Sequence, residues 1–173
     1  MNEIITEILK REGWDKYTDR PNDRGGPTKW GITQKAWSDY LGHPASKADI
    51  QSLSETAARV FYLKMYIHGP KFDLIDDEEL RALVIDCGVN HGPRRATKWL
   101  QLAARVKADG VIGQKTLFAV NTIDPMRLFL KVIAYRIKLY GKLVTKDPTQ
   151  AEFAWGWNNR AAGFLIHAAE ELV

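Results

Sequence analysis

The sequence lacks the residues on which several classes of small protein depend. Its 173 residues include a single cysteine, Cys87, so no disulfide can form within the chain and a zinc site built from several thiolates is excluded. Cys87 lies in an apolar segment and is predicted to be a small core residue. The four histidines show no metal-ligand spacing, and we therefore expect neither a metal ion nor another cofactor.

Long hydrophobic runs and long basic runs are also missing. The first residues, MNEIITEILKREG, contain a short apolar run that Glu3, Glu7 and Lys10 interrupt, so neither a signal peptide nor a membrane span is predicted. We expect a soluble protein that is made in the cytoplasm. The net charge of +4 favours an anionic partner, and the absence of any run of five Lys or Arg makes nucleic acid a weak candidate.

Alternating apolar and polar runs are scarce, and the pattern is helical almost throughout. Ile5, Ile8 and Leu9 share one face of an N-terminal helix, and Gly42 is expected to end a second short helix. The sequence predicts a single all-α globular domain of about seven or eight helices, with one short β-hairpin possible within residues 15–33.

Capping signals predict where further helices begin. Ser52 and Glu55 have the spacing of a capping box, which predicts a helix from there to Gly69. The acidic run DDEE, Pro93 and the pair Asp124-Pro125 each mark a helix N-terminus. A last helix is expected over residues 160–172.

Glu12 is the first candidate for chemistry. It continues the apolar stripe of Ile5 and Ile8, and a carboxyl group in that position tends to be partly buried. Burial disfavours the charged form and raises the carboxyl pKa, which suits a general acid near neutral pH. The alternative is a solvated acid at a helix end.

The loop after Glu12 supplies further carboxylates. Asp15, Asp19 and Asp23 precede the pair Gly25-Gly26, which lets the backbone approach a ligand closely, and Thr28 adds a hydroxyl that can hold a water molecule. A glycosidase needs two carboxyl groups that flank one bond. The alternative for the aspartates is work in turns and caps, where Asp is common.

Four stretches carry a family resemblance. They are EGW…D…NDRGGPTKWGIT, VFYLKMYIHGPKFD, VIDCGVNHGPRRATKWLQ and ADGVIGQKTL, and the resemblance as a whole covers residues 4 to about 140. In this order they resemble the phage-type N-acetylmuramidases of glycoside hydrolase family 108, the last stretch being similar to a turn of that family's peptidoglycan-binding region. The order Glu, Asp, Thr is also similar to that of phage T4-type lysozymes.

The resemblance implies a lysozyme-like fold and a set of site residues. Glu12, Asp23 and Thr28 would be catalytic. The implied substrate-binding residues are Tyr66, Asn90 and Trp30, although Tyr66 and Trp30 also suit the core and Asn90 also suits a helix cap or turn. Three features depart from the family pattern, namely Trp14, Arg24 and a longer spacing after Glu12. The longer spacing leaves the choice between Asp23 and Asp19 open.

The implied function is that of an endolysin. Residues 1–88 would form the muramidase region, and residues 89–173 a helical region resembling a peptidoglycan-binding domain, packed into the same globule. The enzyme would hydrolyse the β-1,4 bond between N-acetylmuramic acid and N-acetylglucosamine, with inversion or retention open, and so lyse the bacterial host of a phage. It would act as a monomer on periplasmic peptidoglycan, reached through a holin lesion. The rival hypothesis is a non-catalytic peptidoglycan-binding protein of the same fold.

Overall fold

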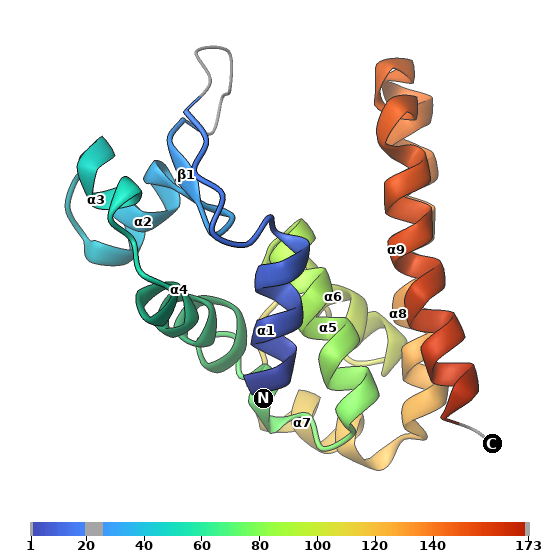
Figure 1. The fold of residues 1–173 in the computed structure, drawn as a ribbon. Helices are drawn as coiled ribbons and strands as arrows, with labels where there is room; N and C mark the ends of the chain where they lie inside the picture. Colours follow the sequence, from blue (N-terminus) through green and yellow to red (C-terminus); the bar gives the residue numbers. More distant parts are fainter. Residues whose placement is uncertain (1, 20–25, 172–173) are drawn as a thin grey trace. The chain divides into compact units, whose positions relative to one another are not determined.

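The computed structural model describes residues 2–19 and 26–171, which fall into two compact units (Figure 1). The first unit is Met1–Gly69 and the second is Pro70–Val173. The described residues are mostly helical, and their strands form one two-stranded antiparallel hairpin. The predicted helical class and the short hairpin are therefore confirmed. The functions predicted for residues 1–88 and 89–173 stay predictions.

The first unit combines short helices with the hairpin. Its elements are α1 (Asn2–Arg11), β1 (Thr28–Lys29), β2 (Ile32–Thr33), α2 (Gln34–Leu41), α3 (Lys47–Gln51), α4 (Glu55–Tyr62) and the π-helical turn η1 (Leu63–His68). Gly42 ends α2 with a φ of 78°, as predicted, because glycine adopts this left-handed conformation without a steric cost. Ile5, Ile8 and Leu9 are buried on one face of α1, which confirms the predicted stripe.

The predicted start of α4 is wrong by two residues. Ser54, not Ser52, caps this helix, and its hydroxyl accepts a hydrogen bond from the Ala57 N–H at 3.2 Å. A capping box occurs one helix earlier, where Ser46 and Asp49 satisfy each other's backbone N–H groups at the start of α3. Ser52 and Ser54 can both cap a helix through their hydroxyl groups, so sequence spacing alone could not show which of them begins α4.

Within the described residues, the regular elements of the second unit are all helices. Its elements are η2 (Phe72–Leu74), α5 (Glu78–His91), α6 (Pro93–Ala103), α7 (Gln114–Thr122), α8 (Pro125–Lys146), η3 (Pro148–Gln150) and α9 (Ala151–Glu170). Asp77 and Asp124 cap α5 and α8, and Pro93 occupies the first turn of α6, as predicted. Cys87 is fully buried in α5, which confirms its core role.

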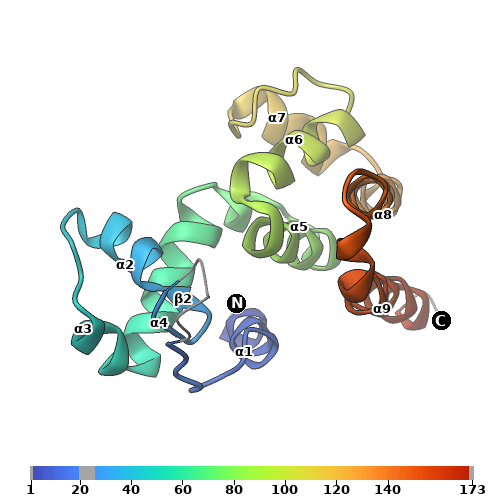
Figure 2. The same ribbon diagram turned by 90° about the horizontal axis from the view of Figure 1, so that it is seen from above.

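The last helix is longer than predicted. It begins at Ala151 rather than near residue 160, and α8 and α9 run side by side in both views (Figures 1 and 2). Asp147 holds the short turn η3 by accepting from the N–H and hydroxyl of Thr149, and α9 follows at once. Trp157 then stacks on Tyr140 of α8 with ring centroids 5.3 Å apart. Packing against α8 therefore extends the helix beyond its predicted start.

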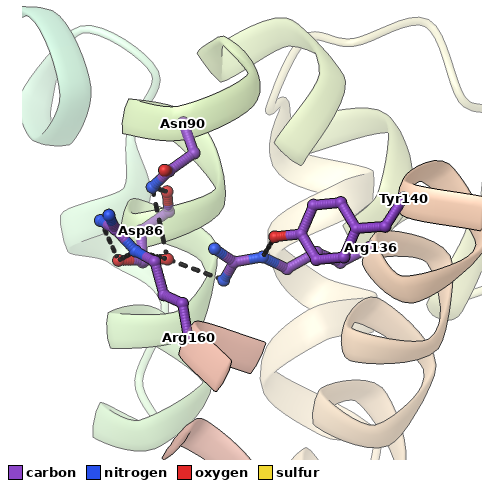
Figure 3. A network of polar contacts seen from close by, with 5 residues as sticks. All are labelled: Asp86, Asn90, Arg136, Tyr140 and Arg160. Atoms are coloured by element: carbon purple, nitrogen blue, oxygen red, sulfur yellow. Dashed lines mark hydrogen bonds and ion pairs between the residues drawn. The ribbon is translucent and has the colours of Figure 1, made fainter. Parts of the chain in front are cut away.

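A buried ion cluster joins α5, α8 and α9 (Figure 3). The carboxylate of Asp86, which is 2% exposed, accepts from Arg136 Nη1 at 2.7 Å and from Arg160 Nη2 at 2.8 Å. Arg136 is fully buried and also donates from Nε to the Tyr140 hydroxyl. Burial acts to raise the pKa of Asp86, but the charges of Arg136 and Arg160 outweigh it and hold that pKa below its usual value. Asp86 is therefore ionised and neutralises part of the arginine charge.

His91 ends α5 beside this cluster and makes folding sensitive to acid. Its ring packs on Trp99 and Tyr140, and burial together with the charges of Arg136 and Arg95 lowers its pKa from 6.5 to about 4. Between these pH values the unfolded chain binds a proton that the folded chain does not, so stability falls as pH decreases from about 6.5 towards 4 and is unaffected by His91 above this range.

We expect His91→Gln to flatten this part of the pH dependence. The measurement is the free energy of unfolding in urea, from pH 7.5 to pH 4.5, for the wild type and the variant. His43→Gln is the matched control, because His43 is exposed. Equal slopes for wild type and His91→Gln across this range would contradict the expected role of His91.

No helix among the described residues is long and apolar enough to span a lipid bilayer.

Candidate active site

Glu12 follows directly on α1, in the first unit. Its N–H continues the helical pattern by donating to the Ile8 carbonyl at 2.9 Å, and its side chain is half-buried. The chain then turns away, because Gly13 and Trp14 both have positive φ values, 98° and 51°. The Trp14 N–H donates back to the Leu9 carbonyl at 2.8 Å. The hydrogen bond to Ile8 therefore holds Glu12 at the end of the helix, and the chain changes direction immediately after it.

The turn of the hairpin packs against Glu12. Gly31 lies in this turn with a φ of 73°, and a methyl group added to it would lie 2.6 Å from Cβ of Glu12. The same methyl group would lie 2.8 Å from the hydroxyl oxygen of Tyr62. The Tyr62 hydroxyl donates to the Trp30 carbonyl at 2.9 Å, which ties α4 to the turn. Gly31 thus lies where the end of α1, the hairpin turn and α4 meet beside the candidate acid.

Tyr66 belongs to the same group of side chains. It lies in η1, and its ring is 5.5 Å from that of Tyr62. Burial, and after it the negative charge of Glu12, raise the pKa of Tyr66, so its hydroxyl is within electrostatic reach of the Glu12 carboxylate. A π-helical turn often occurs at a functional site because it re-aims side chains within a helix. The structure therefore brings Tyr66 together with Glu12, while its contact with substrate stays a prediction.

Trp30 lies in the interior of the first unit. It is 5% exposed, its indole N–H donates to the Leu53 carbonyl at 2.9 Å, and its ring meets Trp14 edge to face at 5.7 Å. Of the two roles left open by the sequence, this placement is that of a core residue that supports the turn beside Glu12. Leu53 also lines a pocket of about 320 Å³, together with Trp37 and His43, to which Glu12 does not contribute.

Three aspartates are candidates for the second carboxylate, and the structure describes two of them. Asp23 lies outside the described residues. Asp19 is bound to Lys47 at 2.9 Å, and Asp15 to Lys29 at 3.2 Å. Each of these two carboxylates is thus paired with a lysine, and the choice of the second carboxylate stays a prediction.

Thr28 begins the hairpin whose turn contacts Glu12. Its backbone pairs with Thr33 in the hairpin and with Thr18 in an isolated bridge. The hydroxyl donates to the Gly26 carbonyl at 3.0 Å. Because this bond uses its only proton, the Thr28 oxygen can act towards a water molecule only as an acceptor.

Asn90 lies on α5 in the second unit and its side chain is exposed. Its amide group donates to the Asp86 carbonyl at 2.8 Å and points at the Asp86 carboxylate at 3.5 Å (Figure 3). With the amide N–H groups turned inward, the Asn90 side-chain oxygen is left as an acceptor for a ligand. Its role in substrate binding stays a prediction.

Gly31→Ala is expected to disable the site more than to unfold the protein. The added methyl group would need the space of Glu12 Cβ and the Tyr62 hydroxyl, so the carboxyl group would move by more than the few tenths of an ångström that catalysis tolerates. We expect roughly a 10²-fold loss of kcat/KM for glycan hydrolysis, with about 1–3 kcal/mol of destabilisation from the strained backbone.

Gly42→Ala is the matched control for this substitution. Gly42 has a similar φ of 78°, but a methyl group there would meet no atom within 4 Å. It should lose similar stability and keep its activity. If Gly42→Ala and Gly31→Ala lower kcat/KM equally, backbone strain and not the contact with Glu12 is responsible.

Sequence reasoning missed two members of this site, Gly31 and Tyr62. Their contact joins segments that are far apart in the chain, and no local pattern reports such a contact. One signal was present, because Tyr62 and Tyr66 are spaced to lie on one face of a helix.

Among the described residues, no three side chains of the types His, Cys, Asp and Glu gather as a metal site would require.

Comparison with known proteins agrees with the resemblance noted in the sequence. The model of the family described as Glycosyl hydrolase 108 matches residues 5–92, and that of a "Predicted Peptidoglycan domain" matches residues 95–162. The solved structures include that of Brucella abortus SagA, which is 30% identical with a TM-score of 0.82. The alignment covers 98% of this chain and 93% of the SagA chain. The search of curated protein sequences gave no match.

Proposed function

Because the chain belongs to glycosyl hydrolase family 108, we propose that it is an N-acetylmuramidase that cleaves bacterial peptidoglycan. The bond would be the β-1,4 linkage between N-acetylmuramic acid and N-acetylglucosamine. The observation that carries the proposal is the placement of Glu12, half-buried at the end of a buried helix face and beside Gly31 in the turn of the hairpin.

Glu12 would act as the general acid. Its proton passes to the glycosidic oxygen while the bond from that oxygen to the anomeric carbon breaks. The anomeric carbon then carries positive charge, which a second carboxylate stabilises, and Asp23 is the proposed residue. Asp19 is the less suitable candidate because Lys47 already neutralises it.

Thr28 would position the water molecule that completes hydrolysis. Since its hydroxyl proton is given to Gly26, the Thr28 oxygen accepts a hydrogen bond from water and turns a water lone pair towards the sugar. The water oxygen bonds to the anomeric carbon, and the released proton returns to a carboxylate. Carboxyl groups about 5–5.5 Å apart would give retention, and about 6.5–9.5 Å would give inversion.

The biological role belongs to the same proposal. We propose a phage endolysin that lyses the host, works as a monomer, and reaches the periplasmic peptidoglycan after a holin has opened the membrane. This part rests on the resemblance of the sequence motifs to phage-type N-acetylmuramidases.

Release of soluble fragments from purified peptidoglycan sacculi tests the enzyme against the binding-only rival. An enzyme at about a thousandth of the concentration of glycosidic bonds should release fragments until most of the sacculi dissolve, because each molecule turns over many times. A binding protein sediments with the sacculi and releases nothing. Sedimentation without release at any protein concentration would replace the proposal with its rival.

A further inference from the structure

Positive charge is concentrated in one part of the second unit. Residues 94–146 contain twelve lysines and arginines but only two acidic residues, Asp109 and Asp124. Asp109 accepts hydrogen bonds from the Gln101 side chain and the Val111 N–H, and Asp124 caps α8 by accepting from the Arg127 N–H. Both acids thus serve local backbone structure. The basic side chains of this segment create a field that attracts anions.

Three of these cations converge at the junction of α6 and α8. Arg105 lies in the turn just after α6, and the ammonium group of Lys131 on α8 donates to the carbonyl of Ala103, in the last turn of α6, at 3.1 Å. Arg127 lies one turn before Lys131 on the same face of α8. Desolvation, and then the charges of Arg127 and Arg105, lower the pKa of Lys131. We call Arg105, Arg127 and Lys131 the basic cluster.

The basic cluster is unfavourable for the folded chain by itself. Like charges four residues apart on a helix repel, and Arg105 also has a φ of 59°, which is costly for a residue with a side chain. Within the described part of the chain, none of the three side chains forms an ion pair with an acid. Repulsion among like charges that an anionic ligand would relieve is typical of a site whose energy is recovered on binding.

Apolar side chains lie next to the basic cluster. Leu102 is 46% exposed beside Ala103, and Leu130 is 50% exposed beside Lys131 and one turn from Arg127. A ligand that suits this surface therefore has both anionic groups and short apolar groups. The stem peptides of peptidoglycan have both, as carboxylates and methyl groups on one short chain. A phosphate backbone has the charges without apolar side chains.

We propose that the basic cluster, flanked by Leu102 and Leu130, binds the carboxylates of peptidoglycan stem peptides. The inference rests on the proposed function, since it assigns the peptide part of the same substrate to the second unit. All five residues lie within the segment matched by the model of the predicted peptidoglycan domain. Recognition of the substrate would then combine glycan contacts near Glu12 with peptide contacts at this surface.

Binding in a catalytically inactive background tests the inference. The Glu12→Gln protein, which should leave the substrate intact, is sedimented with whole sacculi and with glycan strands stripped of peptides by an amidase. We expect Arg105→Glu with Lys131→Glu to weaken binding to whole sacculi at least tenfold and to leave binding to stripped glycan unchanged. Lys115→Glu with Lys142→Glu is the control with the same change of net charge, since both lysines are exposed and lie outside the basic cluster.

Arg105→Gly separates binding from folding. Glycine suits the positive φ at this position, so the variant should be as stable as the wild type or more stable, yet bind whole sacculi more weakly. Undiminished binding by Arg105→Gly would contradict the inference. Equal losses for the cluster variant and its control would also contradict it, because they would show only a general effect of charge. A third result would contradict the inference, namely that the protein binds vesicles of anionic lipid tightly through the basic cluster but does not bind sacculi in this way.

Hydrolysis of the stripped glycan distinguishes failure of this inference from failure of the proposed function. Wild type and the cluster variant should cleave stripped strands at the same rate, and only whole sacculi should show a higher KM for the variant. A wild type that cleaves neither substrate would overturn the proposed function, and the sedimentation result would still decide whether the basic cluster binds stem peptides.

Discussion

Glu12→Gln should lower kcat for peptidoglycan hydrolysis by about 10²–10⁴-fold, because the amide cannot donate the proton that the leaving oxygen needs. The side chain keeps its size, so the contacts of Cβ and Cγ with Gly31 should remain. Binding to sacculi should change little, since the substitution removes an interaction that matters in the transition state more than in the ground state. The rate of fragment release at saturating sacculi measures the effect.

Glu7→Gln is the matched control for this prediction. Glu7 lies on α1, the helix that Glu12 follows, and it pairs with Lys10 at 2.9 Å and is half-exposed. Its substitution should therefore change kcat by less than twofold and stability by less than about 0.5 kcal/mol. Retention of more than about a tenth of the wild-type kcat by Glu12→Gln would assign the acid to another residue.

Of the single substitutions considered, Asp86→Asn should lower the free energy of unfolding the most. The amide has the shape of the carboxylate but no charge, so it leaves the fully buried guanidinium of Arg136 without a counter-ion. Removing one partner of a buried pair costs about 3–5 kcal/mol, and the free energy of unfolding in denaturant reports it. Asp39→Asn removes an acid from an exposed pair with Lys35 and should cost less than about 1 kcal/mol.

A double substitution shows whether the loss comes from the unpaired charge. Asp86→Leu with Arg136→Met removes both members of the buried pair and fills their place with apolar atoms, and Arg160, which is 21% exposed, can turn its charge to solvent. We expect most of the lost stability to return. A double variant that is less stable than Asp86→Asn would mean that packing of the cluster, and not its charge, holds the three helices.

The spacing of apolar residues and the capping residues predicted the N-terminal helix and several helix starts. The stripe of Ile5, Ile8 and Leu9 predicted α1 and placed Glu12 at its end, and the helix starts at Asp77, Pro93 and Asp124 follow from capping chemistry alone. The same chemistry also occurs at Ser52, where the structure does not use it. Whether a capping residue is used depends on the packing of the helix that follows.

Contacts between distant segments explain what the sequence could not predict. Gly31 and Tyr62 come close to Glu12 only after the hairpin and α4 have packed on the end of α1. Gly31 has no local signature for this role, and the spacing of Tyr62 from Tyr66 is the one local signal for Tyr62. The Asp86 cluster is a second example, because isolated charged residues are expected at the surface and these become buried only as a group. Packing on Tyr140 likewise extends α9 back to Ala151.

Digestion of purified sacculi in water enriched in oxygen-18, followed by mass analysis of the soluble fragments, identifies the bond that the protein cleaves and the part that Glu12 plays. We expect fragments that end in N-acetylmuramic acid and carry one heavy oxygen at its anomeric carbon. They should form with the wild type and be absent with Glu12→Gln. Unlabelled anhydro ends, label on N-acetylglucosamine, or equal amounts of product from both proteins would contradict the assignment of this chain as a muramidase with Glu12 as its acid.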